Sequence, residues 1–219
     1  MDKREFGNKD KTETSRKLTP AEEKRLKAFE EHSDELIRQG FTRSDLTIGI
    51  VKANVFGVVL LIPLLIIGYG IFILKNGWDG RSFASFSGII LLVAILVSIV
   101  LHELIHGISW AIFTPNGFKD IEFGFIKQYL TPYCTCLAPL TKWQHIFGAA
   151  MPMVILGIIP MIIGILIGNS IVMIFGIIMI DAAAGDIMVI WAILKYGSKA
   201  KDVVYLDHPT QAGGVIFER

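Results

Sequence analysis

The chain has 219 residues, of which 53% are hydrophobic and 19% are charged, and its formal net charge is +1. The charged residues gather near the two ends, whereas the middle of the sequence consists of long apolar runs. This distribution argues against a soluble globular protein and predicts an all-α polytopic membrane protein, with about four transmembrane helices, an N-terminal amphipathic helix and a small cytoplasmic-side β element. No nucleic-acid motif is present, because the basic residues before the first apolar run are interleaved with acidic ones.

The N-terminal region is expected to contain a tail and one helix. Residues 1–18 are charged and poor in apolar side chains, which predicts a disordered tail. Residues 19–45 read as a cytoplasmic amphipathic helix that begins at a Thr19-Pro20-Ala21-Glu22 capping box and can end at Gly40. We expect no secretory signal peptide here, because no apolar run interrupts this region. The apolar side of the helix should pack on the protein's own cytoplasmic face or on lipid headgroups, or alternatively on a partner; it carries Leu26, Phe29, Leu36 and Ile37.

Four apolar runs follow, and each is long enough to cross a hydrocarbon core of about 30 Å at 1.5 Å per residue. If both ends of the chain are cytoplasmic, nineteen of the twenty-one Lys and Arg residues lie on the cytoplasmic side. The sequence therefore predicts a multi-pass protein of the cell membrane, in contact with the lipid bilayer, with cytoplasmic N- and C-termini. The expected spans are residues 54–74, 88–113, 146–167 and 171–194.

The second run contains the motif His102-Glu103-Leu104-Ile105-His106. On a helix this H-E-x-x-H spacing places two imidazoles on one face, one turn apart, with the carboxylate beside them. Two histidine nitrogens suit two corners of a tetrahedral Zn²⁺ site, and Glu103 can act as the proton-transferring acid/base of a hydrolase. Three polar groups within a membrane span are costly, which favours a metal site over a polar contact between helices.

The third ligand is expected from the fourth run, which crosses the membrane in the same direction as the second. Asp186 lies at the same depth as His106, about 10 to 12 Å from the cytoplasmic end of its helix, and small residues around it allow close helix packing. Asp181 is the alternative ligand, or else a group that orients a histidine, since a carboxylate five residues earlier cannot point at the same neighbour. His145, at the mouth of the third run, is a weaker candidate that is more simply a solvated interface residue.

The segments outside the spans are expected to be partly β. The cytoplasmic loop 114–145 contains an alternating stretch over 120–125, and the tail 196–219 contains two short strand-like runs that can extend the same sheet. An exposed strand edge in this loop could hold an unwound substrate by β-augmentation; otherwise the loop is a hairpin at the interface. Cys134 and Cys136 are too close for an ordinary disulfide and read as free thiols, while His208 reads as a turn residue.

Taken together, these motifs resemble a bacterial membrane family described as "putative zincin peptidase", which is similar in plan to the site-2 intramembrane metalloproteases. The resemblance implies zinc ligation by His102, His106 and Asp186 and an acid/base role for Glu103. Site-2 proteases carry the aspartate as Leu-Asp-Gly, whereas the order here is Gly185-Asp186-Ile187, so Asp181 stays in view as a ligand. The resemblance covers about residues 41–217 and includes Thr131-Pro132-Tyr133, Met151-Pro152, Asp207-His208-Pro209 and Gly213-Gly214.

The function expected from the sequence is that of a zinc-dependent intramembrane endopeptidase, carried by residues 46–195 and acting on membrane-protein or peptide substrates near the cytoplasmic side. The alternative is a membrane binding or assembly protein with a structural or non-catalytic metal site. A structural site needs no base, so Glu103 argues against that alternative. A transporter is a third possibility, although four spans without an internal repeat make it a poorer fit. Substrate identity and oligomeric state are left open.

Overall fold

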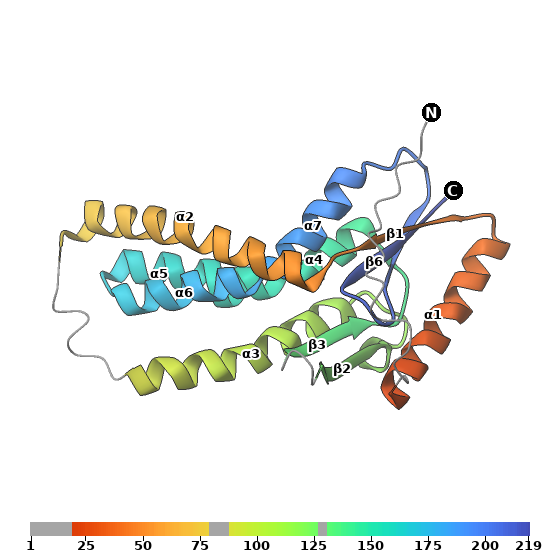
Figure 1. The fold of residues 1–219 in the computed structure, drawn as a ribbon, viewed down its shortest axis with the longest axis horizontal. Helices are drawn as coiled ribbons and strands as arrows, with labels where there is room; N and C mark the ends of the chain where they lie inside the picture. The colour runs from red at the N-terminus through yellow and green to blue at the C-terminus, as the bar shows by residue number, and fades with distance from the viewer. Residues whose placement is uncertain (1–18, 79–87, 127–130) are drawn as a thin grey trace.

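The computed structural model describes residues 19–78, 88–126 and 131–219. The expected disordered tail, residues 1–18, lies outside the described residues. The remaining chain is mostly helical, with a small antiparallel sheet and a separate hairpin gathered at one end of the helices (Figure 1).

The long apolar runs are helical, as expected. Within the described residues, three helices are long and apolar enough to cross a membrane, and the number of candidate spans is four if a bent pair of helices counts as one. Figure 1 shows α2, α5 and α6 running side by side, with α3 diverging from them toward its N-terminal end. The helices are α2 (Ile50–Asn76), α3 (Gly88–Ala111), α4 (Lys142–Pro152) continued through a π-helical turn (Met153–Ile158) into α5 (Ile159–Ile167), and the pair α6 (Ser170–Ala182) and α7 (Ala184–Tyr196).

The fourth run departs from the single straight span that the sequence predicts. It breaks at Ala183, and α6 and α7 meet at an angle of 51°. The break corrects the assumption of one continuous helix through both aspartates, because Asp181 lies near the end of α6 and Asp186 lies in the first turn of α7.

The sheet has the order β1-β6-β5-β4, and all of its pairings are antiparallel. The two expected tail strands are present as β5 (Val203–Asp207) and β6 (Gly213–Glu218), and they join β4 (Leu140–Thr141). The strand β1 (Thr42–Thr47) was not expected, because its polar sequence lacks the apolar alternation of a buried strand; it begins inside the segment 19–45 that was expected to be helical and extends past it.

The expected strand in the cytoplasmic loop is β2 (Ile121–Ile126), which follows a short 3-10 helix (Gly117–Asp120). It pairs only with β3 (Thr131–Cys136), so the tail strands do not extend this hairpin. The hairpin and the sheet are instead linked by side chains, because the Asp207 carboxylate of β5 accepts hydrogen bonds from β3.

The amphipathic helix α1 (Pro20–Arg38) begins at the predicted capping box, in which Thr19 and Glu22 cap each other's backbone N–H. Its buried side chains recur every three or four residues and face the protein's own sheet, so the helix packs internally. Phe29 and Leu36 are buried there, whereas Ile37 is exposed, contrary to expectation.

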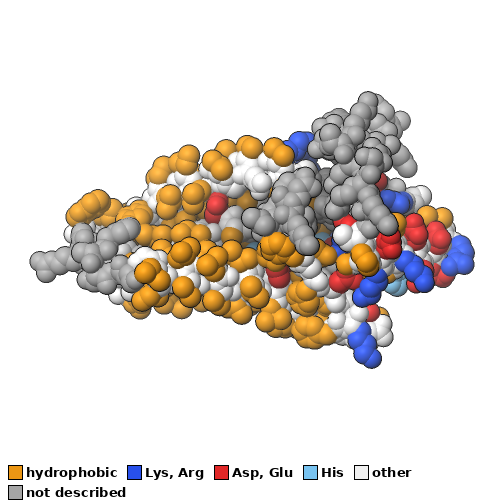
Figure 2. Space-filling model, turned by 60° about the horizontal axis from the view of Figure 1, so that its bottom comes forward, with side chains coloured by type: hydrophobic (Ala, Val, Ile, Leu, Met, Phe, Trp, Pro, Cys, Tyr) orange, Lys and Arg blue, Asp and Glu red, His pale blue; other side chains and the backbone are white. Residues whose placement is uncertain are grey.

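The surface divides into two parts (Figure 2). Hydrophobic side chains cover the helical part, whereas Lys, Arg, Asp and Glu gather at the end that carries α1 and the strands. The exposed large apolar residues of α2 and α3 are of the kind that lipid would cover. This surface is compatible with a membrane protein.

Candidate metal centre

The two histidines of α3 face the interior of the protein. His102 and His106 are buried, with 8% and 4% of their surfaces exposed, and their ring centroids are 4.8 Å apart. All buried residues of α3 lie at or after Ser98, so the packed half of this helix is the half that carries the motif. The four-residue spacing thus has the consequence expected of a helix, since both rings point the same way.

Asp186 reaches the same point from α7. Its Oδ2 lies 3.1 Å from His102 Nε2, and its Oδ1 lies 3.3 Å from His106 Nε2. The two Nε2 atoms are themselves 3.2 Å apart. Among the described residues, these three side chains form the one group whose ligand atoms are close enough to hold a metal ion.

The spacing of these atoms fits zinc. Ligand atoms about 2.0 to 2.1 Å from a tetrahedral ion are roughly 3.3 Å from one another. The closest separations, 3.1, 3.2 and 3.3 Å, are near that value, with a different oxygen of the Asp186 carboxylate facing each histidine. Two imidazoles and one carboxylate are also a donor set that zinc accepts, and three protein ligands leave a fourth position for water or substrate.

The ring of His106 is fixed by two further contacts. Its Nδ1 donates to the Gly148 carbonyl of α4 at 2.9 Å, which directs Nε2 at the cluster. The indole of Trp110 stacks on the ring with the centroids 5.0 Å apart and the planes 11° from parallel. Trp110 is held in turn by a 3.2 Å hydrogen bond from its Nε1 to the His145 carbonyl.

Glu103 lies on α3 between the two histidines and is half-buried. The backbone of Cys134 on β3 lies beside its carboxylate. The hairpin therefore covers the side of α3 that carries Glu103. Cys134 and Cys136 are free thiols, as expected; burial raises the pKa of both, that of Cys136 to about 12.

The remaining candidates lie outside the cluster. Asp181 packs against Gly57 of α2 and is not a member of the cluster. His145 is not the solvated residue that was expected: it is 3% exposed, stacks near Tyr205, and its Nδ1 lies 3.8 Å from an oxygen of Asp207. His208 is a turn residue as expected, since its Nδ1 accepts backbone N–H groups from residues 210 and 211.

Three contributors to the site were missed from the sequence. Trp110 lies four residues after His106, a spacing at which helical side chains meet, and this could have been noticed. Gly148 and Cys134 contribute a backbone carbonyl and a backbone N–H. Because every residue carries these groups, side-chain identity gives no signal for them.

Comparison with known proteins adds one similarity. Residues 95–201, which run from within α3 to just past the end of α7, match the model of a family described as "Putative zincin peptidase". No curated protein and no solved structure matches the chain. The matched stretch contains all three members of the cluster together with Glu103, and the similarity points to a zinc-dependent metallopeptidase.

Proposed function

We propose that this protein is a zinc-dependent endopeptidase that hydrolyses peptide bonds of membrane-protein substrates within the membrane, near its cytoplasmic side. The observation that supports it most is the convergence of His102, His106 and Asp186 at zinc-like separations, with a carboxylate, Glu103, on the same helix. The similarity to zincin peptidases supports the same chemistry. A site that served only to hold structure would need the three ligands but no acid/base group.

Each residue has a distinct task in this proposal. His102, His106 and Asp186 would hold the zinc ion, which when bound supplies Lewis acidity that acidifies water and polarises a carbonyl group. Glu103 takes the proton from the attacking water and delivers it to the leaving amine. Peptide hydrolysis then proceeds without an acyl-enzyme, since no side chain attacks the carbonyl carbon.

The depth of the site supports cleavage close to one membrane surface. Gly148, whose carbonyl holds His106, lies six residues after Lys142, or about 9 Å along α4. Lys142 begins this helix with its ammonium above the ring of exposed Trp143, as residues at a membrane interface commonly do. The distribution of Lys and Arg assigns this surface to the cytoplasm.

That orientation places both chain ends in the cytoplasm. Epitope tags at either end should resist protease added to intact spheroplasts and be lost once the membrane is permeabilised. A tag inserted between α2 and α3 should be cleaved in intact spheroplasts and serves as the control. Cleavage of either terminal tag before permeabilisation would contradict the orientation.

The backbone contacts of β3 bear on which edge of the hairpin could bind a substrate strand. On the outer edge of β3, the N–H of Cys136 donates to Asp207 at 2.8 Å and that of Cys134 faces Glu103, while Pro132 has no N–H. Over residues 132–136 this edge therefore has no N–H to spare for a substrate strand. β-Augmentation by an unwound substrate remains a prediction for the edge of β2.

The Glu103→Gln variant tests the proposal. It removes the proton acceptor but keeps the size of the side chain, so zinc content should match that of the wild type while proteolysis falls at least about 100-fold. The measurement compares the new N-terminal peptides in membranes of cells that express the wild type or Glu103→Gln. The control is Glu31→Gln, on the exposed face of α1. Equal cleavage by the wild type and Glu103→Gln would refute the proposal.

A further inference from the structure

The β2–β3 hairpin lies between α1 and α3 and presents a different face to each. The cross-strand pairs Glu122 with Thr135 and Gly124 with Tyr133 carry one face, because side chains alternate along a strand. The intervening pair carries the other face, where Phe123 packs against Gly107 of α3 and Cys134 adjoins Glu103. The hairpin thus connects α1 with the helix of the metal centre.

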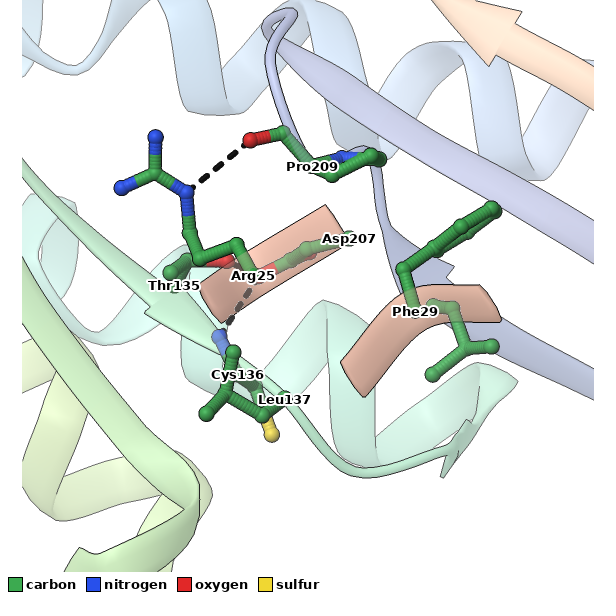
Figure 3. Close-up of a pocket in the computed structure, with 8 residues that line it drawn as sticks. Arg25, Phe29, Thr135, Cys136, Leu137, Asp207 and Pro209 are labelled. Carbon is green, nitrogen blue, oxygen red and sulfur yellow. Dashed lines mark hydrogen bonds between the residues drawn. The ribbon is translucent and has the colours of Figure 1, made fainter. Parts of the chain in front are cut away.

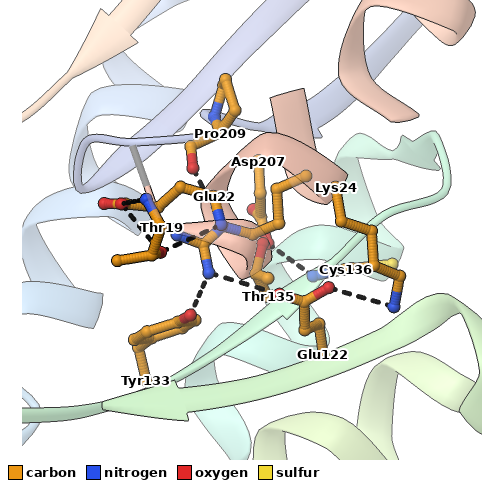
Figure 4. Close-up of polar contacts among 10 residues, drawn as sticks. Thr19, Glu22, Lys24, Glu122, Tyr133, Thr135, Cys136, Asp207 and Pro209 are labelled. Carbon is orange, nitrogen blue, oxygen red and sulfur yellow. Dashed lines mark hydrogen bonds and ion pairs between the residues drawn. The ribbon is translucent and has the colours of Figure 1, made fainter. Parts of the chain in front are cut away.

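Arg25 of α1 is the residue that engages the polar face, on which Figure 4 labels Glu122, Tyr133 and Thr135. Its side chain is only 9% exposed, and its guanidinium lies 4.5 Å from the centre of the Tyr133 ring. Its Nη1 donates to the Tyr133 hydroxyl and lies 3.4 Å from Glu122 Oε1. Its Nε donates to the Pro209 carbonyl at 2.9 Å (Figure 3). One side chain therefore joins α1, both hairpin strands and the turn between β5 and β6.

The carboxylate that Arg25 binds is itself almost buried. The Glu122 side chain is 11% exposed, and its second oxygen lies 3.3 Å from Lys24 Nζ, so its two cationic partners among the described residues come from α1. A buried carboxylate is costly when it loses its cations. The hairpin accordingly depends on α1 for the neutralisation of its only acidic residue.

The two halves of α1 dock differently. Phe29 and Leu36, in the later turns, pack against β5 and β6 in a dry apolar cluster. Arg25, one turn before Phe29, makes the polar contacts with the hairpin. The apolar end anchors the helix to the sheet, and the polar end reaches from that anchor to the hairpin.

We infer that α1 is a strap and that Arg25 is a positioning residue, which holds the hairpin against α3 so that the backbone of Cys134 keeps its contact with Glu103. The role of Glu103 in this inference rests on the proposed function. Withdrawal of Arg25 loosens the hairpin and releases the acid/base carboxylate, yet leaves His102, His106 and Asp186 in place because none of them contacts the hairpin's polar face. Regulation of the site can therefore act through α1 without loss of metal.

The two cysteines provide a direct test, because they are the only ones in the chain and both lie on β3. Burial keeps their thiols protonated, so alkylation of the wild type by N-ethylmaleimide at pH 8 should be slow. In Arg25→Ala, alkylation of Cys134 should be at least about 10-fold faster, as read by peptide mass spectrometry. Arg25→Lys keeps a cation at this position but cannot make all the contacts of the guanidinium. Its rate of Cys134 alkylation should lie between those of the wild type and Arg25→Ala.

Lys27→Ala is the matched control, since Lys27 is 80% exposed on the outer side of the same helix. Its alkylation rate should equal that of the wild type, and zinc per chain should be the same in all these variants. Tyr133→Phe, which removes a single hydroxyl, should also accelerate labelling and covers the case in which Arg25→Ala does not fold. Labelling at the wild-type rate in both Arg25→Ala and Tyr133→Phe would overturn the inference, as would equal acceleration in Lys27→Ala.

These measurements need no substrate. If Arg25→Ala exposes Cys134 but the wild type cleaves nothing, the strap stands and the proposed peptidase function fails. If the wild type cleaves and labelling does not respond to Arg25, the peptidase function stands and the strap fails.

Discussion

At the scale of single residues, the metal centre depends on how one imidazole is held. The Gly148 carbonyl fixes the protonated nitrogen of His106, and Trp110 fixes the plane of its ring. The sequence identified His102 and His106 through their spacing and proposed Asp186, with Asp181 as the alternative, because metal-binding chemistry depends on side-chain identity. It did not reveal Gly148, since that contact uses a backbone group whose position depends on how α4 packs against α3.

Gly148→Ala should weaken zinc binding by about 10-fold to 100-fold. A methyl group at this position would overlap the indole of Trp110, which must then shift off the ring of His106. Loss of groups that orient a metal ligand typically costs this much affinity. The measurement is zinc competition with a fluorescent chelator. The control is Gly185→Ala, where an added methyl meets nothing within 4 Å although Asp186 is adjacent. Unchanged zinc affinity in both variants would contradict the role of Gly148 and Trp110 in holding the His106 ring.

At the scale of elements, the fourth apolar run shows that hydrophobic patterning does not predict a break within a helix. Its length and composition predict one span in which depth alone leaves both aspartates as candidate ligands, and in the structure it is Asp186 that lies beside His106. The break at Ala183 carries no Pro and was not predicted, because small residues permit either a straight or a bent helix. The polar strand β1 was not predicted either, because its pairing with β6 depends on residues that are distant in the sequence.

Close helix packing through glycine makes a separate prediction for the pair α5 and α6. A Cβ on Gly176 would collide with the backbone of Met161, so the helices must separate to accept it. Gly176→Ala should lower the free energy of unfolding by about 1 to 3 kcal/mol, measured by denaturant titration in mixed micelles. Gly70→Ala on α2, where nothing lies within 4 Å, should be neutral or slightly stabilising. Equal stability of the two variants would show that this contact is loose in solution.

At the scale of the whole molecule, apolar helices carry the candidate site and the polar end covers it. The division between hydrophobic and charged sequence predicted the two parts of the surface. It could not predict that α1, β3 and the tail meet beside α3, because those contacts join Arg25 to residues about a hundred or more positions away. The proposed function therefore requires, before anything else, that the clustered side chains bind zinc.

The most direct test is the amount of zinc per chain, measured by elemental analysis of tag-free protein in mild detergent without chelators. The wild type and Asp181→Ala should each hold close to one zinc ion, whereas His106→Ala and Asp186→Ala should hold almost none. A wild type without metal, or one whose zinc content is unchanged by His106→Ala, would mean that the three side chains form only a polar contact between α3 and α7, and the proposed peptidase function would be wrong.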